Sequence, residues 1–160
     1  MFVAIIRVLF GFVVAALVAG TIQVGFAVGP EALLRGLSEG DRTAEWVLLT
    51  ATHAAVFAAP FALIAASVGE WQSLRSPIFY VLAGGAVAAA GFMAQHQSEI
   101  PGQPSIVNTY AAVTYGVTGA LAGFAYWLSA GRWAGDQGTP ESTPAKPVDA
   151  AVATAGAKKA

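Results

Sequence analysis

The chain contains two histidines, and one of them, His53, lies inside a long uncharged stretch. Residues 46–69 contain no Asp, Glu, Lys or Arg, and a stretch of that length can cross a bilayer as a helix. At 1.5 Å per residue, His53 would sit about 12 Å below the membrane boundary. An ionisable group at such a depth indicates a functional site. Thr50 on the same helix, with Tyr115 and Thr118 on a later one, completes a candidate polar site that could line a permeation pathway for a small solute or ion.

A structural role for His53 competes with this interpretation and is favoured by its energetics. A neutral imidazole costs far less to bury than a fixed charge, so it can bond a carbonyl or hydroxyl group, with Tyr115 and Thr118 as candidate partners. The other histidine, His96, falls near the end of its segment, about 10 Å shallower. Haem ligation by both histidines of one chain is therefore disfavoured, and a pair of His53 residues across a dimer is the remaining haem arrangement. We expect no cofactor and no metal site.

Most other chemistry lacks the residues that it needs. The chain has no cysteine, which excludes a disulfide, a thiolate nucleophile and an iron–sulfur cluster. It also has no HExxH motif and no Gly-rich phosphate loop, so we expect no enzymatic activity. Every carboxylate falls in a connection or at a helix end. The small proton-coupled exporters, which have a similar architecture, depend on a membrane-embedded carboxylate, so coupled transport is disfavoured.

The composition is that of an integral membrane protein. Hydrophobic residues make up 56% of the 160 residues and charged residues 11%, whereas soluble domains are roughly 25% charged. A net charge of -1 with scattered Lys and Arg argues against nucleic-acid binding. The expected partners are the lipid bilayer and either further copies of the chain or another membrane protein.

Four membrane-spanning helices are expected, at about 5–28, 45–69, 77–97 and 109–131, packed up and down as one domain over residues 1–133. A secretory signal peptide competes for the first segment, but the apolar run continues past Gly20. Residues 29–44 form either a short surface helix or a solvated connection. Residues 134–160 contain three prolines, no aromatic residue and no Leu or Ile, so a disordered tail is expected.

Several residues predict where the helices begin and bend. Pro60 cannot donate a backbone hydrogen bond and should kink the second span. Arg7, near the start of the first span, is expected to reach the lipid headgroups as a simple anchor. The expected N-cap residues are Asp41 or Thr43, Ser76, and Asn108 or Thr109.

Small residues recur every four positions and predict close helix packing. The fourth span contains a GxxxG pattern, and similar rows occur in the first and third spans. There are more of these rows than one four-helix bundle obviously needs, which favours self-association. The packing residues are Gly11, Ala15, Ala19, Gly84, Ala88, Gly119 and Gly123.

The distribution of Lys and Arg predicts the orientation of the four spans. Six of them lie on the side that holds both termini and two on the other side, which favours cytoplasmic termini. The two groups are Arg7, Arg75, Arg132, Lys146, Lys158 and Lys159 against Arg35 and Arg42.

Two segments carry a resemblance to known proteins. Residues 69–80 (GEWQSLRSPIFY) and 125–132 (AYWLSAGR) resemble segments of small four-span bacterial inner-membrane proteins of uncharacterised function. The resemblance implies the four-span architecture and a bacterial inner-membrane location, and it implies no activity.

Three functions follow from the sequence, in this order. The first is a non-enzymatic accessory or assembly subunit, or a self-associating scaffold, because packing rows are abundant and reaction chemistry is absent. The second is a permease lined by His53 and the Tyr/Thr face of the fourth span. The third is a redox subunit associated with haem or quinone.

Overall fold

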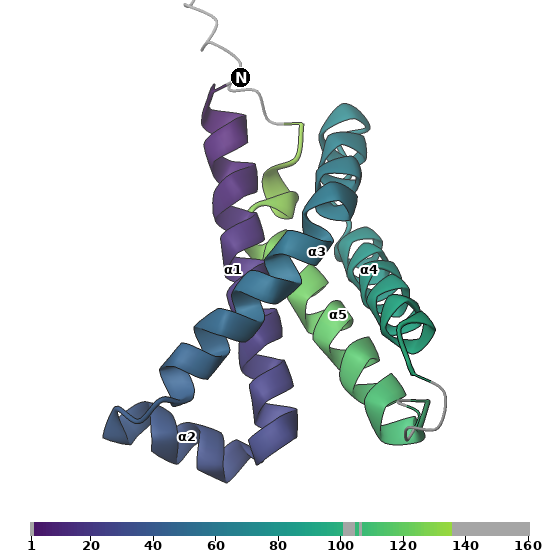
Figure 1. Ribbon diagram of the computed structural model, residues 1–160. Helices are drawn as coiled ribbons and strands as arrows, with labels where there is room; N and C mark the ends of the chain where they lie inside the picture. The colour runs from purple at the N-terminus through teal and green to yellow at the C-terminus, as the bar shows by residue number, and fades with distance from the viewer. Residues whose placement is uncertain (1, 101–104, 106, 136–160) are drawn as a thin grey trace, which may run out of the picture.

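The structure is a computed structural model that describes residues 2–100, 105 and 107–135. Over this part of the chain the fold is entirely helical (Figure 1). Four of the helices are long and apolar enough to cross a membrane, which confirms the predicted all-α fold with four spans. The predicted tail lies outside the described residues from residue 136 onward. The elements are α1 (Phe2–Val28), α2 (Pro30–Glu39), α3 (Thr43–Trp71), α4 (Pro77–Gln97), α5 (Thr109–Ser129) and a 3-10 turn, η1 (Gly131–Trp133).

The four long helices lie in the order α3, α1, α5, α4. Helix α5 packs against both α1 and α4, and α1 also packs against α3, whereas α3 and α4 make few contacts with each other. Figure 1 shows the start of α1 and the end of α3 at one end of the molecule and α2 at the other. We call these the N-terminal end and the α2 end of the bundle.

The contact between α4 and α5 is made by glycines. A Cβ built on Gly119 would lie 2.5 Å from the carbonyl oxygen of Gly84 and 2.6 Å from the Cβ of Ala88. A Cβ built on Gly123 would lie closer still to the carbonyl oxygen of Tyr80. The GxxxG pattern therefore lets two backbones of the same chain touch.

Small residues of α1 make its two helix contacts. A Cβ on Gly11 would lie 2.6 Å from the Cβ of Ala130, just after α5. Near the other end of α1, a Cβ on Gly20 would lie 2.6 Å from the carbonyl oxygen of Val47 in α3. Ala19 is buried beside Gly20, so this row of small residues also serves packing within the chain.

The connection between the first two spans contains a ten-residue helix, α2. Its Leu33 is buried against Val24 of α1 and Val47 of α3, while Leu34 and Leu37 are exposed. Leu33 thus packs α2 against the bundle, whereas Leu34 and Leu37 lie on the exposed surface of α2.

Two of the three predicted helix starts are confirmed. Asn108 caps α5, because its Oδ1 accepts a hydrogen bond of 2.8 Å from the amide of Ala111, as predicted. Ser76 occupies the N-cap position of α4 but its side chain makes no capping bond. Pro77, whose fixed φ suits a helix start, is the first residue of this helix.

The start of α3 lacks a side-chain cap. Its N-cap residue is Arg42, and Asp41 accepts a hydrogen bond from the amide of Arg42 rather than from inside the helix. The prediction that Asp41 or Thr43 caps this helix was wrong.

Helix α3 bends within its length. Pro60 lies inside the helix, and Figure 1 shows α3 changing direction near its middle, as expected where proline interrupts the hydrogen-bond ladder. Before the bend, α3 packs on α1. After it, Gly69 reaches the ring of Tyr80 at the start of α4.

Candidate intramembrane cavity

A cavity of about 480 Å³ lies among the four spans and is lined by residues from each of them. This volume falls within the range of roughly 300–1,000 Å³ that is typical of small-molecule sites. Most of the lining is Ala and Gly, and none of the lining residues identified in the described part of the chain is Asp, Glu, Lys or Arg. The polar lining residues are Gln23, His53, Tyr80, Gln95, Ser98, Tyr115, Thr118 and Tyr126.

Three of the four residues of the sequence-derived site meet at this cavity. His53, Tyr115 and Thr118 line it, from α3 and α5. Thr50 instead lines a smaller hollow of about 350 Å³ between α1 and α3. Of the packing residues, Ala15, Ala19, Gly84, Ala88, Gly119 and Gly123 also contribute to the cavity wall.

Glutamine side chains of the cavity were not anticipated from the sequence. Gln23 of α1 lines both the cavity and the smaller hollow, and Gln95 of α4 lines the cavity near its α2 end. Gln23 is the one amide side chain in the uncharged run of α1. A single amide side chain in an uncharged membrane span is a signal by which Gln23 could have been identified from the sequence.

The hydrogen-bonding groups of the cavity are not paired with one another. In the described part of the structure no hydrogen bond joins His53 to Thr118, so this expected partnership is not formed. Thr118 is 4% exposed, and its hydroxyl has no partner in the described part of the structure. An unpaired buried hydroxyl costs about 1–3 kcal/mol. The cavity therefore holds unused capacity for binding a polar group.

Phe57 of α3 lines the cavity and reaches α4. A Cβ on Gly91 of α4 would lie 3.3 Å from the ring of Phe57 and 3.8 Å from that of Tyr115. The ring of Tyr115 in turn contacts Phe92 edge-on, with centroids 5.4 Å apart. Three aromatic rings therefore gather beside Gly91, where even a methyl side chain would be a tight fit.

The cavity is polar at one end and walled by small residues in its middle. Gln23, His53, Gln95 and Ser98 lie toward the α2 end, while Tyr80 and Tyr126 lie at the N-terminal end with ring centroids 5.3 Å apart. Tyr80 and Ser98 are 18 positions apart, which along α4 corresponds to about 27 Å. The cavity thus extends over most of the roughly 30 Å hydrocarbon thickness of a bilayer.

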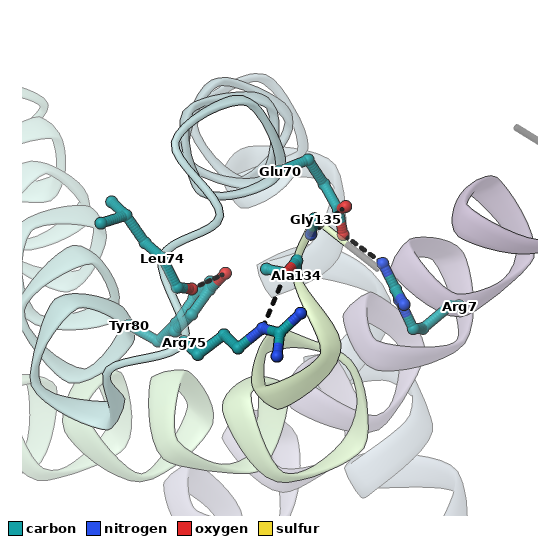
Figure 2. Close-up of polar contacts among 7 residues, drawn as sticks. All are labelled: Arg7, Glu70, Leu74, Arg75, Tyr80, Ala134 and Gly135. Carbon is teal, nitrogen blue, oxygen red and sulfur yellow. Dashed lines mark hydrogen bonds and ion pairs between the residues drawn. The ribbon is translucent and has the colours of Figure 1, made fainter. Parts of the chain in front are cut away.

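An ion pair closes the N-terminal end of the bundle (Figure 2). Arg7 Nη2 lies 2.7 Å from Glu70 Oε1, and the other carboxylate oxygen of Glu70 accepts a 2.9 Å hydrogen bond from the amide of Gly135. The two side chains are only 15% and 25% exposed. The prediction that Arg7 is a simple headgroup anchor is therefore incomplete, because its guanidinium joins α1 to α3.

The segment after α5 is held against this ion pair. Arg75 Nε donates a 3.1 Å hydrogen bond to the carbonyl of Ala134 (Figure 2), and Ala134 is fully buried. Trp127 Nε1 donates to the carbonyl of Arg75 at 2.7 Å, and the hydroxyl of Tyr80 donates to the carbonyl of Leu74 at 3.0 Å. Ala134 was assigned to the tail from the sequence, but it is packed into the bundle end.

Comparison with protein-family models, with curated proteins and with solved structures gives no match. Function must therefore be inferred from the chemistry of the cavity. Among the residues that the structure describes, no three His, Asp or Glu side chains lie close enough together to hold a metal ion.

Proposed function

We propose that this membrane protein is a permease that binds a small uncharged molecule in the cavity among its four spans. The observation that supports this proposal best is a cavity of about 480 Å³ with polar groups but no formal charge in its described lining. An ion at this depth would need compensating charges, so an uncharged solute fits the lining better. His53 and Thr118 offer hydrogen bonds that no other described side chain uses.

The two ends of the cavity support a pathway that opens and closes. The α2 end carries exposed polar side chains, including Gln95 and Ser98. The N-terminal end is covered by the pair of Arg7 and Glu70 and by the packed Ala134. Passage of the molecule through the membrane would require this covering to move. Binding of the molecule would require only that the α2 end be accessible.

Binding is tested by native mass spectrometry of the protein extracted from its own membrane in a mild detergent. We expect the unchanged protein to carry a small-molecule adduct. Ala62→Phe, which fills the cavity from α3, should lose the adduct. Ala86→Phe makes the same change at an exposed position of α4 outside the cavity lining and should keep it. A protein without an adduct in all three samples contradicts the proposal.

Transport is tested with the molecule that the adduct identifies. Proteoliposomes containing the unchanged protein should take it up faster than those containing His53→Ala, with equal assembly of both proteins. Equal uptake by protein-free liposomes would leave a binding protein but exclude a permease.

A non-enzymatic accessory or assembly subunit is the second candidate. The observation that favours it is the scarcity of contacts between α3 and α4, which leaves room for a helix of another membrane protein. The same mass spectra decide between the candidates, because a stoichiometric protein partner in place of a small-molecule adduct supports the accessory subunit.

We also propose a bacterial inner-membrane location with both termini in the cytoplasm. The location is supported by the resemblance of residues 69–80 and 125–132 to bacterial four-span proteins. The orientation is supported by the division of Lys and Arg along the sequence, with six on the predicted side of the two termini and two on the other.

A further inference from the structure

We propose that the molecule bound in the cavity is an uncharged amphiphile that enters from the lipid bilayer. Its polar head group would lie near Gln23 and Gln95, with His53 deeper in the cavity, and its hydrocarbon chain would lie along the Ala and Gly walls toward Tyr126. This inference rests on the proposed binding of an uncharged molecule and names its chemical class.

The polarity of the cavity matches the way a lipid lies in one leaflet. Gln95 is two residues from the end of α4 and Gln23 five residues from the end of α1, so both lie near the membrane boundary. Ala62, Ala83 and Ala122 line the cavity nearer the middle of the spans. An amphiphile in the leaflet on the α2 side also has its head group at the boundary and its chain toward the centre, so it can occupy the cavity without reorienting.

The hydrogen-bonding groups select a head group with carbonyl or hydroxyl oxygens. Gln23 and Gln95 can each donate and accept through their amides, and His53 can do both through its two ring nitrogens. A phosphate or ammonium head group would meet no opposite charge in the described lining, and its burial would be costly. Deeper in the cavity, the unpaired hydroxyl of Thr118 is suited to a second oxygen, such as one at a head-to-chain linkage.

The opening of the cavity faces lipid. Helices α3 and α4 make few contacts, and Figure 1 shows them diverging toward the α2 end. His53 and Phe57, which line the cavity from α3, are exposed and lie 10 and 14 residues after the start of that helix, well inside the bilayer. A lipophilic molecule can therefore enter sideways past Phe57. A water-soluble molecule cannot cross the lipid to reach this side opening.

The test is photolabelling of the protein in liposomes with hexadecanol that carries a diazirine on its chain. Labelled residues are located by mass spectrometry of peptides. We expect label on the cavity-lining residues Gly84, Ala88 and Ala122 of the unchanged protein, and a several-fold loss there in Ala62→Phe. Ala86→Phe should label these residues as the unchanged protein does, because position 86 is outside the cavity lining.

Competition in the unchanged protein keeps the test independent of whether Ala62→Phe folds. Excess unlabelled hexadecanol should remove the label from the cavity, and excess glycerol, which has a similar head group but no chain, should not. Label that falls only on lipid-facing residues, or competition by glycerol alone, would overturn the inference.

The mass spectra separate failure of this inference from failure of the proposed function. A water-soluble adduct that disappears in Ala62→Phe, with no label in the cavity, would keep the binding function and exclude an amphiphile. An absent adduct together with an unlabelled cavity would exclude both.

Discussion

Replacing Gly119 with alanine should weaken the contact between α4 and α5. The added Cβ would lie 2.5 Å from the carbonyl oxygen of Gly84 and 2.6 Å from the Cβ of Ala88. The first of these atoms belongs to the backbone of a packed helix, so no side-chain rotation relieves the clash and the helices must separate. Such overpacking costs about 1–3 kcal/mol.

Gly116→Ala is the matched control for this change. Gly116 lies one turn earlier in α5, and a Cβ there would have nothing within 4 Å. Both substitutions favour the helix by up to about 1 kcal/mol through propensity, so this contribution cancels in the comparison. We expect the free energy of unfolding of Gly119→Ala to be about 1–3 kcal/mol below that of Gly116→Ala.

The assay is unfolding of the detergent-solubilised protein by increasing sodium dodecyl sulfate, followed by circular dichroism. Two variants of equal stability, within about 0.5 kcal/mol, would refute the close backbone contact. A change in oligomer size for Gly119→Ala, with the stability of the monomer unchanged, would instead place this glycine between copies of the chain.

Three further predictions concern the ends of the bundle. Arg7→Met leaves the carboxylate opposite it unpaired and should lower the free energy of unfolding by about 1.5–3 kcal/mol; a loss below about 0.5 kcal/mol in the same assay would mean that the pair contributes little. Asn108→Ala removes a capping bond and should cost about 0.5–2 kcal/mol, whereas Ser76→Ala, at an N-cap position without such a bond, should change stability by less than about 0.5 kcal/mol. Because the chain has no cysteine, Ser38→Cys and Gln72→Cys each introduce a single thiol. A membrane-impermeant maleimide should label Ser38→Cys in intact cells and Gln72→Cys only after lysis. The opposite labelling pattern would invert the proposed orientation.

The four spans could be predicted because the bilayer imposes a simple rule on the sequence. A segment that crosses it needs about 20 residues with few charges, and such segments are visible without knowing what packs against them. The ten-residue helix α2 was harder to predict, since it depends on Leu33 being buried against α1 and α3. That contact exists only once the bundle is formed.

The ion pair of Arg7 and Glu70 shows a second limit of sequence reasoning. The two residues are 63 positions apart, each near the end of a span, where a charge is inexpensive and needs no partner. Nothing local distinguishes a paired arginine from a lipid-facing anchor. The same holds for Ala134, whose neighbours in the sequence resemble a disordered tail although the residue itself is buried.

The depth of the candidate site residues in the membrane could be predicted from the sequence. The side of the helix on which each residue lies could not. His53, Tyr115 and Thr118 lie at depths that let them share one cavity, as proposed from their positions. Thr50 precedes His53 by less than one turn and was grouped with it, yet it lines the hollow toward α1. The way α3 lies against α1, fixed by Gly20 and Val47, separates these two neighbours.

The rows of small residues carry less information about oligomers than their number suggests. The contact of α4 with α5 is packed around Gly84, Gly119 and Gly123. The contact of α1 with the end of α5 is packed around Gly11. These backbones are already in contact with another part of the same chain, so they cannot also receive a second copy. These four glycines therefore give no support to self-association, whereas Gly85 and Gly116 have nothing within 4 Å. The cavity, with an unpaired hydroxyl and no charge in its described lining, is a feature that helix packing alone does not explain, and this is why binding of a small uncharged molecule takes precedence over a scaffold.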